Sequence, residues 1–261
     1  MEEENHLLVN RLEKCVKATE QGLRTYFLGK LWGQNTVLAC SRWGKVAAAA
    51  TTTHLIVEHK IDCLFFTGVA GSIDPFLSIG DIVLAHNLVH YDMDASPFFP
   101  PMEVPLLGES AFYPDPALYK ITKKAIKEFL TPLNFGQRIS PKVCREFQIT
   151  SPKLAEGTVA SGDQFIAKQS KAENLKQRLP DAKCVEMEGA AVAQVCYEYG
   201  IPFVIIRTIS DCAGDGAHID FQRFVNKVAS LYSTGIMEIV YENLHSARGF
   251  STQLGDAVIV D

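Results

Sequence analysis

The stretch from the helix-like segment 188–199 to Asp211 constrains the fold more than any other part of the chain. Segment 188–199 carries apolar residues at helical spacing, and Gly200, followed by a proline, would end such a helix. Segment 203–209 is a near-continuous apolar run, which predicts a central strand covered on both faces. The strand would deliver Ser210 and Asp211 to the carboxyl edge of a sheet, where α/β proteins build ligand sites.

Similar alternation of helix-like and strand-like segments occurs along the rest of the chain. Short apolar runs alternate with longer periodic segments, which predicts a mostly parallel sheet flanked by helices. The expected strands are 36–40, 62–67 and 82–89, and the expected helices are 45–59, 114–130 and a long closing helix from Phe221.

The chain length favours one domain. One hydrophobic core can still be filled at 261 residues, and 47% apolar composition is ordinary for a globular protein. We expect a single domain over 1–245. Segment 131–153 has three prolines and four basic residues and reads as a solvated surface insertion, while 246–261 reads as a mobile C-terminal tail.

Composition excludes several functions. A net charge of −5 argues against nucleic acid, and no apolar run approaches the length that spans a membrane. The seven cysteines include no C-x-x-C pair, which favours a reducing, cytoplasmic compartment. The histidines lack zinc-like spacing, so we expect no metal. The expected partner is a small molecule.

Three carboxylates lie at the ends of strand-like runs, namely Glu186, Glu188 and Asp211. Carboxylates there suggest chemistry on a neutral or cationic substrate rather than capture of a phosphate. Taken singly, each residue has another interpretation, since an aspartate after a strand is as often a helix cap as a catalytic group.

An ordered set of motifs is more specific evidence of function than any single residue. The motifs are MEEE, SRWGKVAAAATTT, TGVAGSI, IGDIV, SGDQFI, VEMEGAAVAQVC, RTISD and HIDFQRF. In this order, from Met1 to about Leu244, they closely resemble the 5′-methylthioadenosine/S-adenosylhomocysteine nucleosidases of the nucleoside phosphorylase superfamily. The resemblance implies a three-layer α/β/α sandwich with a twisted mixed central sheet, a homodimer, no cofactor, and hydrolysis of the bond between adenine and its sugar.

The resemblance implies four catalytic residues. Breaking an N-glycosidic bond leaves electron density on the purine and positive charge on the sugar, so that an acid and an activated water are needed. Asp211 would protonate adenine at N7, with Ser210 orienting its carboxyl group. Glu4 would activate the water, and Arg207 would lie near it.

The resemblance also implies a set of substrate-binding residues. Glu188 would accept hydrogen bonds from the ribose hydroxyls, and Met187 would pack on the sugar. Alternation along an extended strand puts Glu186 on the same side as Glu188, and Glu186 is also expected to bind the substrate. Phe165 would stack on adenine, and Ile166 would offer its backbone to the base edge. The remaining expected residues are Ala70 and Gly71 lining the site, Phe98, Phe221 and Trp43 around the 5′ substituent, and Pro105 contributed across the dimer.

The chain departs from the family pattern in three places. The family normally has about eight more residues before its M-E-E-E, enough for one strand, so either the sheet lacks a strand or translation starts upstream. Val69 stands where serine is frequent, and Trp43 stands where a smaller aliphatic residue is usual. Two alternatives stay open: a phosphate-dependent nucleoside phosphorylase, and a catalytically weak adenosine-binding protein.

Overall fold

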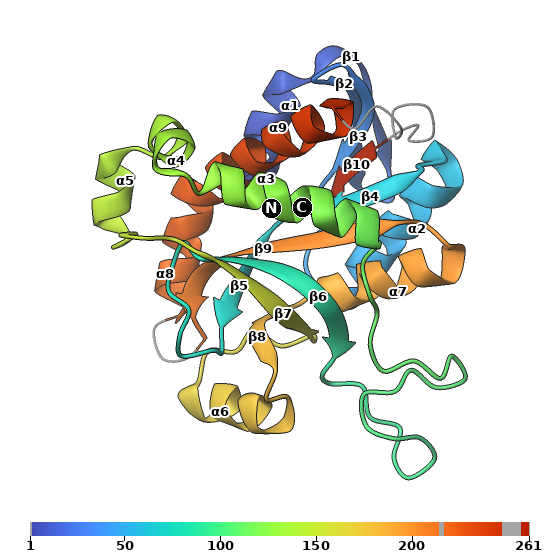
Figure 1. Cartoon of the computed structure of the whole chain (residues 1–261). Helices are drawn as coiled ribbons and strands as arrows, with labels where there is room; N and C mark the ends of the chain where they lie inside the picture. Colours follow the sequence, from blue (N-terminus) through green and yellow to red (C-terminus); the bar gives the residue numbers. More distant parts are fainter. Residues whose placement is uncertain (1, 214–216, 247–256, 261) are drawn as a thin grey trace.

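A mixed sheet forms the centre of the molecule. The computed structural model describes residues 2–213, 217–246 and 257–260, without the side chains of 2–6, 14–19, 217–220, 246 and 257–260. Within that part the sheet has 10 strands in the order β1-β2-β3-β10-β4-β9-β5-β8-β7-β6 (Figure 1). The strands are β1 (Glu13–Gln21), β2 (Arg24–Leu31), β3 (Gln34–Ala39), β4 (Cys63–Phe66), β5 (Val69–Ser72), β6 (Ile82–His90), β7 (Leu154–Ser161), β8 (Ala182–Glu186), β9 (Phe203–Cys212) and β10 (Ala257–Val260).

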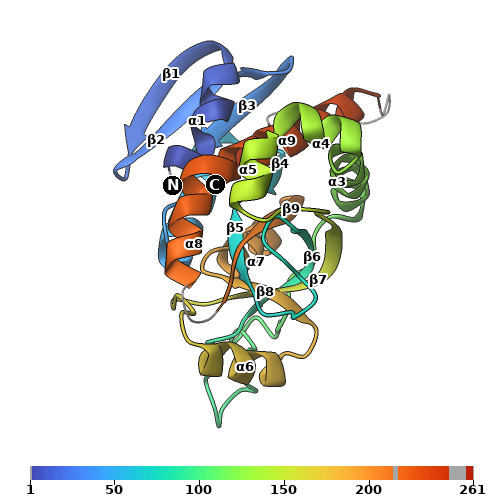
Figure 2. The same ribbon diagram turned by 90° about the vertical axis from the view of Figure 1, so that its left-hand side faces the viewer.

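The sheet has two differently shaped parts. β6 pairs with β9 as well as with β7, so that β9, β5, β8, β7 and β6 form a closed ring of pairings. β1, β2 and β3 form an antiparallel extension, which Figure 2 shows at the opposite end of the molecule from α6. Parallel and antiparallel pairings therefore occur together, and the predicted mixed sheet is confirmed.

Helices cover both faces of the sheet (Figure 1). Alternate residues of the central strands point to opposite sides: Phe65 packs with the side of α1, α3 and α9, and Leu64 packs with the side of α2 and α7. This arrangement is the predicted three-layer sandwich. The helices are α1 (Glu2–Arg11), α2 (Lys45–His59), α3 (Pro116–Phe129), α4 (Pro132–Arg138), α5 (Pro141–Glu146), α6 (Gln169–Arg178), α7 (Gly189–Tyr199), α8 (Ala217–Phe224) and α9 (Ser230–Ser246), with a π-helical turn at Val225–Ala229.

The segment that contains the proposed acid folds close to expectation. The helix predicted over 188–199 is α7, and it ends at Gly200, whose φ of 67° is left-handed as a C-terminal glycine requires. The following strand is longer than the apolar run suggested. β9 continues to Cys212, so Ser210 and Asp211 lie within the strand. Asp211 lies opposite Gly71 of β5, and Ser210 lies at a shift of the register between the two strands.

Segment 131–153 differs from the predicted solvated loop. It folds into α4 and α5, and Ile139, Phe147 and Ile149 are buried in the core. Two of its prolines stand in the first turn of these helices, directly after the capping residues Thr131 and Ser140. Proline at that position starts a helix rather than breaking it, because the missing N–H would have no helical partner there.

The C-terminal segment also differs from expectation in part. Ala257–Val260, expected in a mobile tail, forms β10 in the middle of the sheet, parallel to both β3 and β4. Its four residues are alanine and β-branched residues, a composition typical of strands. Among the helices of the described residues, none is long and apolar enough to cross a bilayer.

Candidate active site

A pocket opens where the central strands end. It encloses about 740 Å³, open solvent included. Its wall comes from the segments that follow β3 and β4, from the ends of β8 and β9, and from the loop after β7. The lining residues are Ser41, Arg42, Trp43, Phe66, Thr67, Gly68, Val69, Ala70, Gly71, Gln164, Phe165, Ile166, Val185, Glu186, Met187, Glu188, Arg207, Asp211, Ala213 and Phe221.

Asp211 is a buried carboxylate held in one orientation. Only 2% of the residue is exposed, and Ser210 Oγ donates a hydrogen bond to its Oδ2 at 2.7 Å. Gly71, on the neighbouring strand, makes room for the other oxygen, because a Cβ at residue 71 would lie 2.8 Å from Asp211 Oδ1. The strand pairing of β5 with β9 therefore fixes the carboxylate at the pocket wall.

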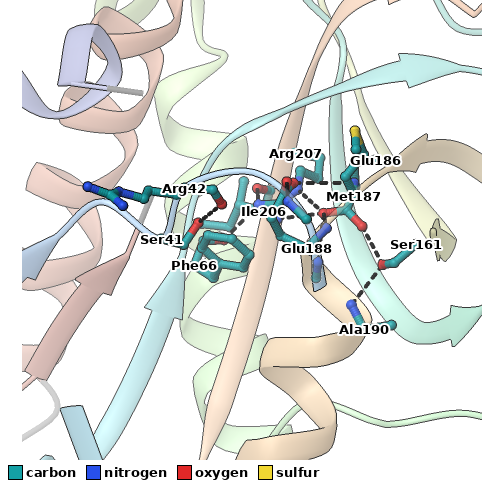
Figure 3. A network of polar contacts seen from close by, with 12 residues as sticks. Ser41, Arg42, Phe66, Ser161, Glu186, Met187, Glu188, Ala190, Ile206 and Arg207 are labelled. Carbon is teal, nitrogen blue, oxygen red and sulfur yellow. Dashed lines mark hydrogen bonds and ion pairs between the residues drawn. The ribbon is translucent and has the colours of Figure 1, made fainter. Parts of the chain in front are cut away.

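Arg207 and Glu186 form a buried ion pair beside this carboxylate (Figure 3). Arg207 Nη2 lies 2.8 Å and Nε 3.2 Å from Glu186 Oε2, and the guanidinium lies 4.1 Å from the centre of the Phe66 ring. Its Nη1 also donates to the carbonyl of Ile206 at 3.1 Å. A buried charge needs such compensation, since removing one partner leaves the other without solvent or counter-ion.

Glu186 and Ser161 together cap the start of α7. Glu186 Oε2 accepts the backbone N–H of Glu188 at 3.2 Å and of Gly189 at 2.8 Å, while Oε1 accepts the Ser161 hydroxyl. Ser161 Oγ in turn accepts the N–H of Ala190 at 2.7 Å. These contacts satisfy donors that a helix N-terminus leaves free. The carboxylate of Glu186 is thus already engaged by the protein, although the sequence indicated a substrate-binding residue.

Glu188 also lines the pocket, and its side chain is held by two backbone N–H groups. Its Oε1 accepts the N–H of Gly44 at 2.7 Å, and its Oε2 accepts the N–H of Met187 at 3.2 Å. Burial raises the pKa of Glu188 to about 7, and the charge of Glu186 adds to the rise, whereas the Gly44 N–H and Arg207 oppose it. Glycine suits residue 44 because its φ of 90° is one that side-chain-bearing residues rarely adopt.

Three aromatic rings line the mouth of the pocket. Phe221 packs edge-on against Trp43 at 5.7 Å and against Phe165 at 5.6 Å between ring centres. Trp43 is 53% and Phe165 is 38% exposed, so that these rings keep apolar surface open to solvent at the pocket. The exposed faces suit a planar base and an apolar sugar substituent.

Most of the predicted site residues meet in this pocket, and a few do not. Ser210 lies behind Asp211 and acts through it. Phe98 is 86% exposed and lies on a loop that does not line the pocket, and Pro105 is half-buried in the same loop. Glu4 lies in α1, and its side chain lies outside the described residues.

Two residues near the site were not predicted from the sequence. Ser161 and Asp163 belong to the SGDQFI motif, yet only its phenylalanine and isoleucine were singled out. Asp163 Oδ1 accepts the N–H of Lys45 at 2.9 Å and so holds the start of α2. The motif was a usable signal for both residues. Within the described residues, no three His, Cys, Asp or Glu side chains gather as a metal site requires.

Comparison with known proteins identifies the relatives of this chain. A family model described as the phosphorylase superfamily matches residues 1–239. The 5′-methylthioadenosine/S-adenosylhomocysteine nucleosidase of Bacillus subtilis is 34% identical over 246 residues, covering 94% of this chain and 96% of that protein.

Solved structures give the same relationship. The 5′-methylthioadenosine/S-adenosylhomocysteine nucleosidase of Neisseria meningitidis, in complex with methylthio-immucillin-A, aligns with a TM-score of 0.81 at 32% identity, covering 94% of this chain and 96% of that one. A futalosine hydrolase of Helicobacter pylori aligns with a TM-score of 0.77 at 30% identity, covering 93% of this chain and 94% of that one. The resemblance drawn from the motifs is confirmed: the chain belongs to the 5′-methylthioadenosine/S-adenosylhomocysteine nucleosidases of the phosphorylase superfamily.

Proposed function

We propose that this protein hydrolyses the N-glycosidic bond of 5′-substituted adenosines and releases adenine. The observation that carries the proposal is the pocket with two carboxylates in different settings, Asp211 buried and Glu188 partly exposed. Asp211 is fixed by a serine hydroxyl, and Glu188 is held by a backbone N–H and has a pKa raised to about 7. One carboxyl group can then serve the departing base while the other binds the sugar, a division of labour like that in glycoside hydrolysis.

Asp211 acts as the acid. Protonation of N7 neutralises the negative charge that develops on the purine as the bond to the sugar breaks. The hydroxyl of Ser210 donates a hydrogen bond to Oδ2 and so orients the carboxyl group at the pocket wall. Phe165 stacks on the adenine ring, and the backbone of Ile166 meets the base edge.

Glu188 binds the ribose hydroxyls. An ionised carboxylate only accepts hydrogen bonds, so that two hydroxyl donors favour its charged form. Met187 packs on the sugar beside it. Glu186 serves a different purpose, since its oxygens are occupied by Arg207, Ser161 and the first turn of α7.

Glu4 activates the attacking water, with Arg207 near the water site. The resemblance of the opening MEEE to the family motif supports this role for Glu4. Arg207 lines the pocket while its guanidinium is bound to Glu186, so that its contribution is to hold the surroundings of the water in place. Bound water at the sugar carbon would meet the positive charge that the departing purine leaves.

Hydrolysis fits the charges of the pocket better than phosphorolysis. A phosphate needs cationic groups or clustered amides. Two arginines line the pocket: Arg207 is paired with Glu186, and Arg42 donates to the carbonyl of Leu23 and points away from the network in Figure 3. Three carboxylates, Glu186, Glu188 and Asp211, line the same pocket, and their negative charge would repel a phosphate.

The names of the relatives and the aromatic rings of the pocket together indicate the substrate class. The relatives are named for 5′-methylthioadenosine and S-adenosylhomocysteine, and one structural neighbour is a futalosine hydrolase. Trp43 and Phe221 offer apolar surface to the 5′ substituent. The candidates are 5′-methylthioadenosine, S-adenosylhomocysteine, 5′-deoxyadenosine and 6-amino-6-deoxyfutalosine, the last an intermediate of menaquinone biosynthesis.

Assembly and location are part of the proposal. We infer a homodimer in which the loop with Phe98 and Pro105 reaches the partner's pocket, which accounts for the exposure of that ring. Free, buried thiols at Cys63, Cys184 and Cys196 support a reducing, cytoplasmic compartment.

Adenine release in phosphate-free buffer tests the proposal. The four candidate substrates are compared side by side, with and without phosphate. We expect turnover without phosphate, and we expect Asp211→Asn to lose most of it, because an amide cannot deliver the proton. The exposed Asp181→Asn is the matched control. Strict dependence on phosphate would select a phosphorylase, and binding of adenine without turnover would select a binding protein.

A further inference from the structure

Strand β10 joins two parts of the sheet that no other described pairing connects. β3 pairs with β2 on one side and with β10 on the other, and β4 pairs with β10 and with β9. Residues from the end of the sequence thus occupy the centre of the sheet (Figure 1). Without them, β3 and β4 would face each other across a gap, each with a row of backbone groups lacking partners.

Such a gap would be costly because the flanking residues are buried. Val37, Leu38 and Ala39 of β3 are at most 3% exposed, and the residues of β4 are at most 1% exposed. Buried backbone N–H and C=O groups are almost always paired in native proteins. Water could not easily replace the strand, so β10 decides whether β3 lies at a fixed place beside β4.

The same two strands lead directly into the pocket. Ser41, Arg42 and Trp43 follow β3, and Thr67 to Gly71 follow β4. The register brings β10 up to this edge, since Val260 lies opposite Ala39 on one side and opposite Phe66, a pocket residue, on the other. The segment after β3 also supplies the Gly44 N–H that binds Glu188.

We propose that β10 is a positioning strand of the binding site. It holds the segment after β3 where Gly44 reaches Glu188 and Trp43 meets Phe221. Asp211 does not depend on this link, because β9 and β5 hold it from the other side. Loss of β10 from the sheet should therefore weaken binding of the substrate more than it slows the acid step.

The register provides a test that does not involve activity. Ala257 lies opposite Cys63 on the neighbouring strand, and such adjacent residues lie within the Cα separation that a disulfide spans. Ala257→Cys, oxidised in the folded protein, should give a 63–257 disulfide within one chain, detected as a linked peptide by mass spectrometry. Val258→Cys, whose opposite residue is Leu64, is the matched control and should not link to Cys63.

A second test uses substrate binding and rests on the proposed function. Ile259→Pro in the full chain removes one N–H donor from the strand, whereas Ile259→Val keeps it. We expect KM for 5′-methylthioadenosine to rise at least about tenfold in the proline variant, with a much smaller change in kcat, and to stay near wild type in the valine variant. Added peptide GDAVIVD should lower KM again, and the same peptide with proline in place of isoleucine should not.

The two tests fail in different ways. A missing 63–257 disulfide, or one that links two chains, would overturn the placement of β10 in its own sheet whether or not the protein is a nucleosidase. An unchanged KM in Ile259→Pro, in a protein that forms the disulfide and turns over its substrate, would overturn the positioning role alone.

Discussion

Replacing Glu188 by glutamine should change how the stability of the protein depends on pH. The carboxyl group ordinarily titrates at 4.5, and burial next to Glu186 raises its pKa in the folded protein to about 7. Between these values the folded state binds a proton that the unfolded state has lost. The contribution of Glu188 is therefore fully present below pH 4.5 and is lost as pH rises through about 7.

The size of the effect follows from the two pKa values. At 1.36 kcal/mol for each pKa unit, the difference between 4.5 and about 7 corresponds to about 3 kcal/mol. Wild-type protein should lose about this much free energy of unfolding relative to Glu188→Gln between pH 4.5 and pH 8. Because the comparison is a difference between two proteins, titrating groups that do not interact with Glu188 cancel.

Urea unfolding at a series of pH values from 4.5 to 8 measures this difference. Glu198→Gln, which removes an exposed carboxylate from the far end of α7, serves as control and should follow the wild-type curve. Parallel curves for wild type and Glu188→Gln would refute the reasoning. A difference that grows in the opposite direction, with wild type gaining stability as pH rises, would show that the pKa of Glu188 is lowered instead.

Two further variants test the packing of the pocket. Gly71→Ala should reduce kcat at least about tenfold, because the new Cβ would lie 2.8 Å from Asp211 Oδ1 and displace the acid. Gly136→Ala is the control, because the space around residue 136 is open. Equal kcat values for the two variants would contradict the close fit of Gly71 against Asp211. Arg207→Met should lower the free energy of unfolding in urea by about 3–5 kcal/mol, because Glu186 would lose its buried partner. A decrease below about 1 kcal/mol would mean that the Glu186 carboxylate is not buried as a charge.

The sequence predicted the elements whose patterns are local. The alanine-rich helix at 45–59 and the helix–strand unit ending at Asp211 appear with nearly the expected bounds, because helical spacing, a stop glycine and an apolar run each act over a few residues. The motif order also located most of the pocket, including Phe165, Glu188 and Arg207.

The remaining features depend on partners far away in the sequence. Glu186 was expected to bind the substrate, and only the fold shows that Arg207 and Ser161 contact its oxygens. β10 looked like part of a polar tail, and its strand forms because β3 and β4 leave a place for it. The prolines of 131–153 suggested a loop, although in the fold two of the three start helices, and Phe147 at the end of α5 is buried.

The oxygen that reaches the sugar tests the central claim most directly. The protein is given 5′-methylthioadenosine in ¹⁸O-labelled water containing phosphate, and the sugar product is reduced with borohydride at once so that its anomeric oxygen cannot exchange. Hydrolysis predicts one ¹⁸O atom at the former bond to adenine, release of adenine in equal amount, and no sugar phosphate. A sugar 1-phosphate as the product would contradict the account.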